Sequence, residues 1–370
     1  MTNHRVGYVG VDHHHRDPYF AIAAALPVDI VAVCEPGREV DPASLRPMTD
    51  RPDEITAGDD DTLEVATDAE SYAEPDDLLA EEDLDIVWIT YSNVETPSIV
   101  EAAVDAGVHV ISEKPIARTA DDLRPITDLA EKRGVSIVPT YFYRANPIVE
   151  RLCEHVASGF FGDIWSIQGR FIGSQLSYRD TNHYIYDAEA SRGGALQWIG
   201  VHWLDIMSHV LDDEIDRVIA TMSPAESADV ECGATVHFET ETGVLGTLQT
   251  GYYLDGTGKD TDFAIYGRDG QAWSPIHHDA TMKSPTAPLT LQSGRPSWDA
   301  APVRSTEYEF SYDTFPAWGD YVFRYFERCL AGLAEGDPLA DIHDAIRILE
   351  ILDAAYASAA EGTWITVGNA

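Results

Sequence analysis

The 370-residue sequence predicts an α/β protein, in which an N-terminal doubly wound parallel sheet precedes an α+β domain with a large, mostly antiparallel, open-faced sheet. Over about the first 145 residues, short β-rich runs alternate with helical segments, as they do in βαβ units. Beyond them, long alternating runs with few intervening helices indicate an antiparallel sheet with one buried face. We therefore expect two domains, 1–145 and 146–370, and the C-terminal helix can pack back on the first.

The elements of the first domain follow one another in a regular order. The segment 40–62 interrupts them, and its Asp, Pro and Gly residues indicate an exposed acidic insertion. The helix that ends at residue 106 meets a stop signal at Gly107. We expect β-rich strands at 5–11, 29–35, 84–90, 108–114 and 135–141, and helices near 19–26, 97–106 and 119–133.

The second domain begins with a helix-rich connector over residues 144–162. Its strands show the alternation of a sheet with one buried face. No internal repeat is present in the sequence. We expect sheet runs within 164–174, 218–225, 234–253 and 261–273, then helices at 315–334 and 342–361 and a short strand at 364–367.

The charge balance is strongly acidic. The chain has 24 Lys plus Arg against 64 Asp plus Glu, a formal charge of −40 and a pI of about 4.4. Nucleic acids and anionic membranes repel such a surface, so neither is an expected partner. One explanation is a cytoplasm with molar salt, where a Debye length of about 3 Å makes the self-repulsion tolerable. The other is an acidic interaction surface.

The cysteines and the N-terminus indicate a soluble, cytoplasmic protein. The four cysteines are widely separated and form no CxxC pair, so we expect small buried hydrophobic residues in a reducing compartment. The first residues lack a basic-then-apolar signal, and no run of 18 apolar residues occurs.

The turn after the first strand carries a partial phosphate-binding pattern, GYVGVDHHH. A Rossmann-type dinucleotide fold needs glycines here, because the backbone must approach a pyrophosphate at a helix N-terminus. Gly10 fits the first glycine of GxGxxG, but Asp12 and His15 occupy the second and third positions. An ionised Asp12 beside a pyrophosphate is unfavourable unless its side chain turns away. The cofactor contacts expected of this turn are Gly10, Val11, Asp12 and His13.

Glu35 ends the second strand, where a carboxylate accepts hydrogen bonds from the adenosine ribose hydroxyls. Its charge would repel a 2′-phosphate, so the sequence predicts NAD rather than NADP. The alternative is an acid at a strand end that serves no ligand in an acid-rich protein.

Several longer segments resemble the Gfo/Idh/MocA oxidoreductases, the glucose–fructose oxidoreductase and inositol dehydrogenase family. The stretch 93–117 resembles the family pattern TPN-x-x-H, A-x-x-A-G-K-H-V and EKP. The segment 193–205, GGALQWIGVHWLD, resembles the one that carries the family's catalytic histidine. Further similar landmarks, which extend the resemblance over nearly the full length, are Tyr143, Arg144, Pro147, Gly159, Gly162 and the tail 338–362.

The resemblance implies an NAD-dependent dehydrogenase of a sugar, polyol or related derivative. Such an enzyme transfers a hydride to nicotinamide while a base removes the hydroxyl proton. Lys114 of the EKP motif and His202 are the implied catalytic residues. Asp205, three residues after His202 on one helix face, could orient its imidazole. The other cofactor contacts that we expect are Tyr91, Asn93, Glu113, Lys114 and Arg144.

The sequence departs from the family pattern at two places. Trp198 stands where the family usually has Asp, four residues before the histidine, and the proline and histidine of TPN-x-x-H are missing. The tryptophan removes one carboxylate from the proton relay and could stack against a sugar. The polar and aromatic stretch 174–184 suits the lip of a carbohydrate pocket. The expected substrate contacts are Arg144, Tyr178, Arg179, Tyr184, Trp198 and Asp205.

No metal site is expected. The three consecutive histidines His13–His15 suggest one, but we expect that three neighbours on a turn do not all face one ion. A second candidate set is His202, Asp205 and His209, and the family resemblance needs no metal.

Two classes of function remain open. The first is the dehydrogenase, of which an NAD-using glycoside-cleaving enzyme is a variant. The second is a non-catalytic dinucleotide- or sugar-sensing regulator of the same fold, which the altered glycine turn and the missing Asp favour. The pair Lys114 and His202 favours the enzyme. The open face of the second sheet suggests a homodimer or homotetramer.

Overall fold

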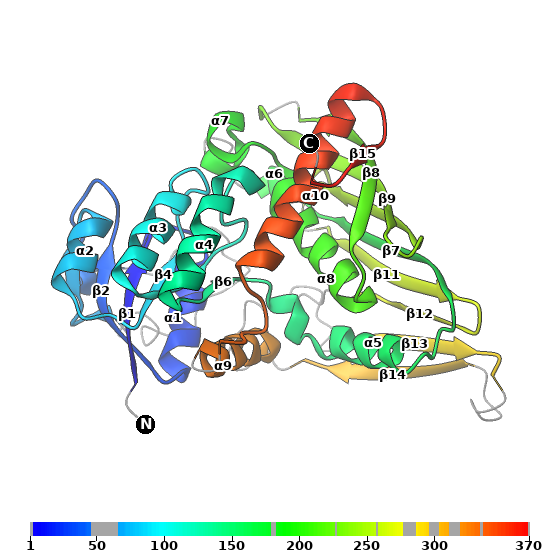
Figure 1. Ribbon diagram of the computed structural model, residues 1–370, viewed down its shortest axis with the longest axis horizontal. Helices are drawn as coiled ribbons and strands as arrows, with labels where there is room; N and C mark the ends of the chain where they lie inside the picture. Colours follow the sequence, from blue (N-terminus) through cyan, green and yellow to red (C-terminus); the bar gives the residue numbers. More distant parts are fainter. Residues whose placement is uncertain are drawn as a thin grey trace. The chain divides into compact units, whose positions relative to one another are not determined.

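The computed structural model describes residues 3–45, 66–178, 183–225, 228–256, 258–276, 286–295, 303–310, 319–333 and 336–368 (Figure 1). They form two compact units. Unit 1 comprises Met1–Thr140 with Ser311–Ile346, and unit 2 comprises Tyr141–Phe310 with Arg347–Ala370. The expected domains, 1–145 and 146–370, differ from these units mainly in the segment 311–346, which lies in unit 1.

Unit 1 contains a parallel sheet of six strands in the order β3-β2-β1-β4-β5-β6. The direction in which strands are added to the sheet reverses between β1 and β4. In open α/β sheets, ligands bind at this reversal point, outside the carboxyl ends of the strands. The doubly wound α/β prediction is confirmed. The strands are β1 (His4–Val9), β2 (Val28–Cys34), β3 (Glu70–Tyr72), β4 (Ile86–Ile89), β5 (His109–Ser112) and β6 (Ile137–Pro139).

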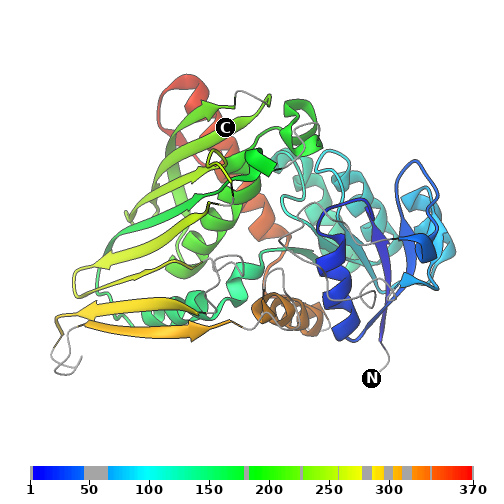
Figure 2. The ribbon, with the colours of Figure 1, turned by 180° about the vertical axis from the view of Figure 1, so that it is seen from behind.

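Helices cover both faces of this sheet. Helices α3 and α4 lie in front of it in Figure 1, and α1 lies on the opposite face, in front in Figure 2. Phe326 of α9 packs on Tyr19 of α1 and on Trp88 of β4, so α9 covers the α1 face. Helix α3 ends at Gly107, whose φ of 79° is the left-handed conformation that glycine favours. The helices are α1 (Arg16–Ala25), α2 (Pro75–Glu81), α3 (Thr96–Ala106), α4 (Arg124–Arg133) and α9 (Asp320–Leu333).

Unit 2 contains a sheet of nine strands in the order β14-β13-β12-β11-β7-β10-β9-β8-β15. The pairing of β10 with β7 is parallel and the others are antiparallel, so the prediction of a large, mostly antiparallel sheet is confirmed. The strands are β7 (Ile164–Ile172), β8 (Ile215–Pro224), β9 (Glu231–Thr240), β10 (Leu245–Gly251), β11 (Asp260–Gly267), β12 (Gly270–Ser274), β13 (Thr286–Ser293), β14 (Val303–Glu309) and β15 (Ile365–Thr366).

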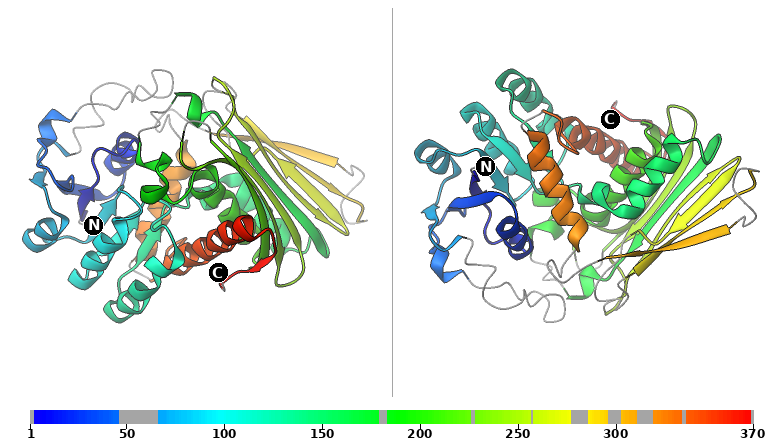
Figure 3. Two further views of the ribbon diagram at one scale, coloured as in Figure 1. Left: turned by 90° about the horizontal axis from the view of Figure 1, so that it is seen from above. Right: turned by 90° about the horizontal axis from the view of Figure 1, so that it is seen from below.

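The helices of unit 2 gather on one face of this sheet (Figure 3). Helix α10 begins in unit 1 and continues from Arg347 in unit 2, where Ser358 Oγ accepts a hydrogen bond from the Ala220 amide of β8 at 3.0 Å. Within the described residues, no helix lies on the other face. The helices are α5 (Pro147–Ala157), α6 (Gln175–Tyr178), α7 (Ala188–Ser191), α8 (Val201–Leu211) and α10 (Ile342–Glu361).

The remaining expectations concern the surface and the thiols. All four cysteines are free thiols, and Cys34 and Cys329 are buried. Most of the acidic insertion expected at 40–62 lies outside the described residues. Among the helices that the structure describes, none is both long enough and apolar enough to cross a membrane.

Candidate functional site

The turn after β1 brings the chain against the end of β4. Gly10 has a φ of +92°, and a Cβ atom there would lie 2.1 Å from the carbonyl oxygen of Thr90. No side chain fits that space, and L residues rarely adopt that φ. Gly10 is therefore required by the close approach of two strand ends at the reversal point of the sheet.

Asp12 turns its side chain away from this turn. Its carboxylate pairs with Arg38 at 2.6 Å. Both side chains are at least half exposed, Arg38 at 50% and Asp12 at 56%. The backbone N–H of Asp12 donates to the buried Glu35 carboxylate at 2.9 Å, and burial raises the pKa of Glu35. Sequence reasoning missed Arg38, although its position three residues after Glu35 was a usable signal.

The three histidines of the turn do gather at one point. One ring nitrogen of each of His13, His14 and His15 lies within 4.8 Å of the other two. The chain coils tightly here, because His13 N–H donates to the Gly10 carbonyl and Arg16 N–H donates to the His13 carbonyl, at 3.2 and 2.9 Å. Three neighbours on a turn were not expected to face one ion, and this coiling brings a ring nitrogen of each to within 4.8 Å of the others.

Glu113 and Lys114 follow β5 and are both buried. The Lys114 Nζ lies 3.8 Å from Glu113 Oε1, and Glu113 Oε2 accepts a hydrogen bond from Tyr19 and lies 3.4 Å from His15 Nδ1. Burial would raise the pKa of Glu113, but His15, Lys114 and His13 outweigh it and hold that pKa well below its usual range. Buried charged pairs with a shifted pKa are typical of functional sites, so Glu113 and Lys114 are candidates for one.

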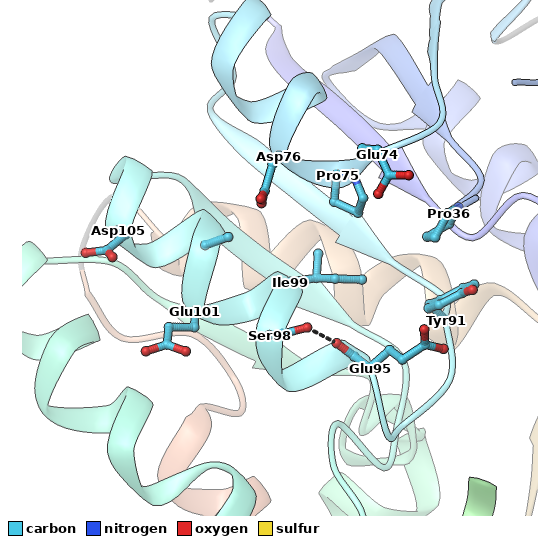
Figure 4. Close-up of a pocket in the computed structure, with 11 residues that line it drawn as sticks. Pro36, Glu74, Pro75, Asp76, Tyr91, Glu95, Ser98, Ile99, Glu101 and Asp105 are labelled. Atoms are coloured by element: carbon cyan, nitrogen blue, oxygen red, sulfur yellow. Dashed lines mark hydrogen bonds between the residues drawn. The ribbon is translucent and has the colours of Figure 1, made fainter. Parts of the chain in front are cut away.

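A cavity of about 490 Å³ lies beside the ends of β2 and β4 (Figure 4). Pro36, Tyr91 and Ile99 give it an apolar wall, and burial is the main cause that raises the pKa of Tyr91 to about 12. Asn93, two residues after Tyr91 in the sequence, is buried, with 1% of its surface exposed. The other lining residues, largely acidic, are Glu74, Pro75, Asp76, Glu95, Ser98, Glu101, Ala102 and Asp105.

In unit 2, His202 lies on α8 and is buried. Its ring packs on Phe142 and Tyr143, with centroid distances of 5.1 and 5.0 Å. Asp205, one turn further along, accepts three bonds from the Arg144 guanidinium, of 2.6 to 3.2 Å. The planar fork of arginine matches a carboxylate, so Asp205 holds Arg144.

Two aromatic candidates of unit 2, Tyr184 and Trp198, pack together. Trp198 is 6% exposed, its indole N–H donates to Ser191 Oγ at 2.6 Å, and it meets the Tyr184 ring edge-to-face. Tyr178 is the last residue of α6, and Arg179 lies outside the described residues.

Glu231 is a buried residue that sequence reasoning missed. Its carboxylate accepts bonds from the Gly194 and Leu196 amides, at 2.8 and 2.9 Å, and from the Tyr356 hydroxyl at 3.0 Å. These bonds anchor the π-helical turn Leu196–Gly200 that leads into α8. One glutamate among 64 acidic residues gives no sequence signal.

The fold and these residues define a class: a dinucleotide-dependent oxidoreductase with an open-sheet second domain. Residues 53–141 match the oxidoreductase family with an NAD-binding Rossmann fold, and residues 149–273 match the GFO/IDH/MocA C-terminal domain. Together these matches span more than half of the chain, which therefore belongs to the Gfo/Idh/MocA oxidoreductase family. The histidine turn lies before the matched range.

Relatives and solved structures agree with this assignment. The chain is 26% identical over 295 residues to D-xylose 1-dehydrogenase (NADP(+)) 2 of Haloferax volcanii, covering 79% of this chain and 83% of that protein. It is 25% identical over 309 residues to D-apiose dehydrogenase of Paraburkholderia graminis, covering 79% and 75%. Levoglucosan dehydrogenase in complex with NADH and levoglucosan has the same fold, with a TM-score of 0.78, 20% identity and complete coverage of both chains.

Proposed function

We propose that the protein transfers a hydride between NAD and a sugar, polyol or related derivative. The observation that carries this proposal is the buried Lys114 at the carboxyl end of β5, paired with Glu113 inside an NAD-binding Rossmann domain. A lysine at that edge reaches a substrate hydroxyl beside a nicotinamide ring. The dehydrogenases among the relatives support a carbohydrate substrate.

The cofactor binds along the carboxyl edge of the parallel sheet of unit 1. The turn Gly10–His13 holds the pyrophosphate, and Glu35 accepts bonds from the ribose hydroxyls. The apolar wall of the cavity at Tyr91, with Asn93 two residues further along the chain, would hold the adenine. Because Glu35 repels a 2′-phosphate, NAD is preferred, whereas the Haloferax volcanii relative is named for NADP(+).

The chemical step needs a hydride acceptor and a base for the hydroxyl proton. NAD, when bound, accepts the hydride at C4 of its nicotinamide. Lys114 and His202 take the hydroxyl proton as the carbonyl forms, so one alcohol gives one carbonyl, one reduced cofactor and one proton. Arg144, which Asp205 holds in place, contacts the substrate and the cofactor. The other proposed substrate contacts are Tyr178, Arg179, Tyr184 and Trp198.

We further propose the salt conditions, the compartment and the oligomeric state in which the enzyme works. The formal charge of −40 supports activity in molar salt, and the four free thiols support a reducing cytoplasm. The open face of the nine-stranded sheet carries Leu245, Tyr266 and Trp273, each more than a third exposed, which supports a homodimer or homotetramer through that face. Light scattering in molar KCl measures the subunit number.

Alanine variants of Lys114 and His202 test the mechanism. A panel of sugars and polyols is offered with NAD in molar KCl, and reduced nicotinamide is followed by absorbance. Each variant should lower kcat by roughly 10²-fold or more, and the double variant should be little worse than the poorer single one. Lys132→Ala and His343→Ala, at exposed positions of α4 and α10, are the matched controls. Wild-type turnover in both single variants would overturn the mechanism.

A non-catalytic sensor is the second candidate, and Trp198 in place of the family's Asp favours it. A sensor would bind NAD and a sugar, as calorimetry measures, without forming reduced nicotinamide. The variant Trp198→Asp then separates the enzyme from the sensor. In the enzyme, this substitution should mainly raise KM for the native substrate, because it reshapes a wall of the pocket.

A further inference from the structure

We propose that His13, His14 and His15 form a binding site for one divalent transition-metal ion of the zinc class. This inference goes beyond the dehydrogenase reaction, which needs no metal. All three residues lie in unit 1, on the turn between β1 and α1.

The imidazole geometry is close to that of a ligand set. The three ring nitrogens lie within 4.8 Å of one another, and ligand atoms around a tetrahedral zinc ion, with Zn–N bonds of about 2.0–2.1 Å, lie about 3.3 Å apart. Closing that difference takes small side-chain rotations. His14 and His15 are only partly buried, so they have room for them.

The ring nitrogens face inward. The atoms His13 Nε2, His14 Nδ1 and His15 Nδ1 each have less than 1 Å² of exposed surface, and the ring centroids are 4.1 to 5.0 Å apart. Imidazole nitrogens suit zinc, nickel, copper and cobalt rather than magnesium or calcium, which prefer oxygen. The site therefore selects for the transition metals.

Glu113 lies outside this set but contacts it. Its Oε2 lies 3.4 Å from His15 Nδ1, and outer carboxylates of this kind orient metal-ligating histidines. The Tyr19 hydroxyl donates to the same carboxylate and fixes its orientation.

Nearby cations oppose the ion but do not exclude it. Lys114 Nζ lies 3.8 Å from Oε1 of the Glu113 carboxylate, which offsets its charge. Arg16 points elsewhere, since it pairs with Asp17 at 2.7 Å and donates to the Val11 carbonyl at 3.0 Å.

One hydrogen bond must adjust. His13 Nδ1 accepts from the His15 backbone N–H at 3.1 Å, which puts the proton of the neutral ring on Nε2. An ion bound through Nε2 requires the other tautomer, with the proton on Nδ1, so the hydrogen bond from the His15 N–H must break.

Titration calorimetry tests the site. The full chain, made without a histidine tag, is stripped with a chelator and titrated with Co²⁺ or Zn²⁺ in molar KCl, which screens the acidic surface. We expect one saturable site per chain, with the strong visible absorption of four-coordinate Co²⁺. His15→Ala and the milder His14→Gln should each weaken binding by at least roughly 10–100-fold, the loss that even outer hydrogen bonds produce.

The controls are His237→Ala and His343→Ala, which remove histidines outside the cluster, and circular dichroism checks that every variant is folded. They should bind as the wild type does. The proposal is overturned if the wild type has no saturable site, or if the cluster variants bind Co²⁺ as tightly as the controls. Since no substrate or NAD is present, this result is independent of the dehydrogenase proposal.

Discussion

Removing the carboxylate of Asp205 should strongly destabilise unit 2. Asp205 is 1% exposed and Arg144 is 8% exposed, and three hydrogen bonds of 2.6 to 3.2 Å join them. Asp205→Ala leaves the guanidinium buried without its counter-charge. Breaking one side of a buried pair costs about 3–5 kcal/mol, and we expect a free-energy loss in this range.

A surface pair in the same unit is the matched control. Asp163 and Arg268 lie 2.7 Å apart, and their side chains are 66% and 63% exposed. Asp163→Ala should cost only about 0–1 kcal/mol, because exposed ions are screened and remain hydrated. Urea unfolding in molar KCl, followed by fluorescence and circular dichroism, measures both variants. Molar salt shrinks the control effect further but leaves the buried pair largely unscreened.

The comparison also separates burial from the mere presence of charge. In Arg144→Met with Asp205→Leu both charges are gone, so most of the loss seen in Asp205→Ala should be recovered. If Asp205→Ala and Asp163→Ala cost the same within about 0.5 kcal/mol, the pair is not the buried, mutually dependent unit described above.

Three further predictions concern the turn and the anchors of the two units. Gly10→Ala should lower Tm more than Gly37→Ala. Both glycines have a positive φ, of +92° and +86°, but of the two only Gly10 would bring a Cβ atom to 2.1 Å from a carbonyl oxygen. Equal shifts in Tm would contradict this steric explanation. Glu231→Gln should cost about 1–3 kcal/mol, because an amide cannot accept at both positions. Burial raises the folded-state pKa of Glu231, so the stability advantage of the wild type should shrink as the pH rises above about 4.3, and an advantage that grows would refute the assignment. Glu35→Ser should narrow the preference for NAD over NADP in binding titrations, while Glu39→Ser should not; equal wild-type affinities would count against Glu35 as the ribose ligand.

The sequence was sufficient for elements that have a period and a stop signal. The strand ends near Glu35 and Lys114, and the helix that stops at Gly107, follow from apolar runs and from the left-handed freedom of glycine. β3 and α2 were missed, because a strand of three residues has no measurable period and α2 buries only Leu78. β13 was missed although it alternates, since Pro288 within it argues against a strand.

Pairings between distant residues could not be predicted. The sequence suggested His202 as a partner of Asp205, because both lie on one helix face, but it did not indicate that Arg144, 61 positions away, donates to the same carboxylate. Periodicity ranks neighbours within one element, whereas the partner of a buried charge depends on how elements pack. For the same reason, nothing in the sequence joins Glu113 to the turn that ends at His15, 98 residues earlier in the chain.

The buried cations form ion pairs whose strength should change little with the salt concentration. Lys114, Arg16 and Arg144 are each 8% exposed or less, and each contacts a carboxylate within 3.8 Å. Salt screens exposed charges over a Debye length of about 3 Å at molar concentration, but ions do not enter a buried pair. Exposed acidic residues, by contrast, repel one another less as the salt concentration rises. The charges proposed for cofactor and substrate are set by local partners, and their pairing depends little on the salt concentration.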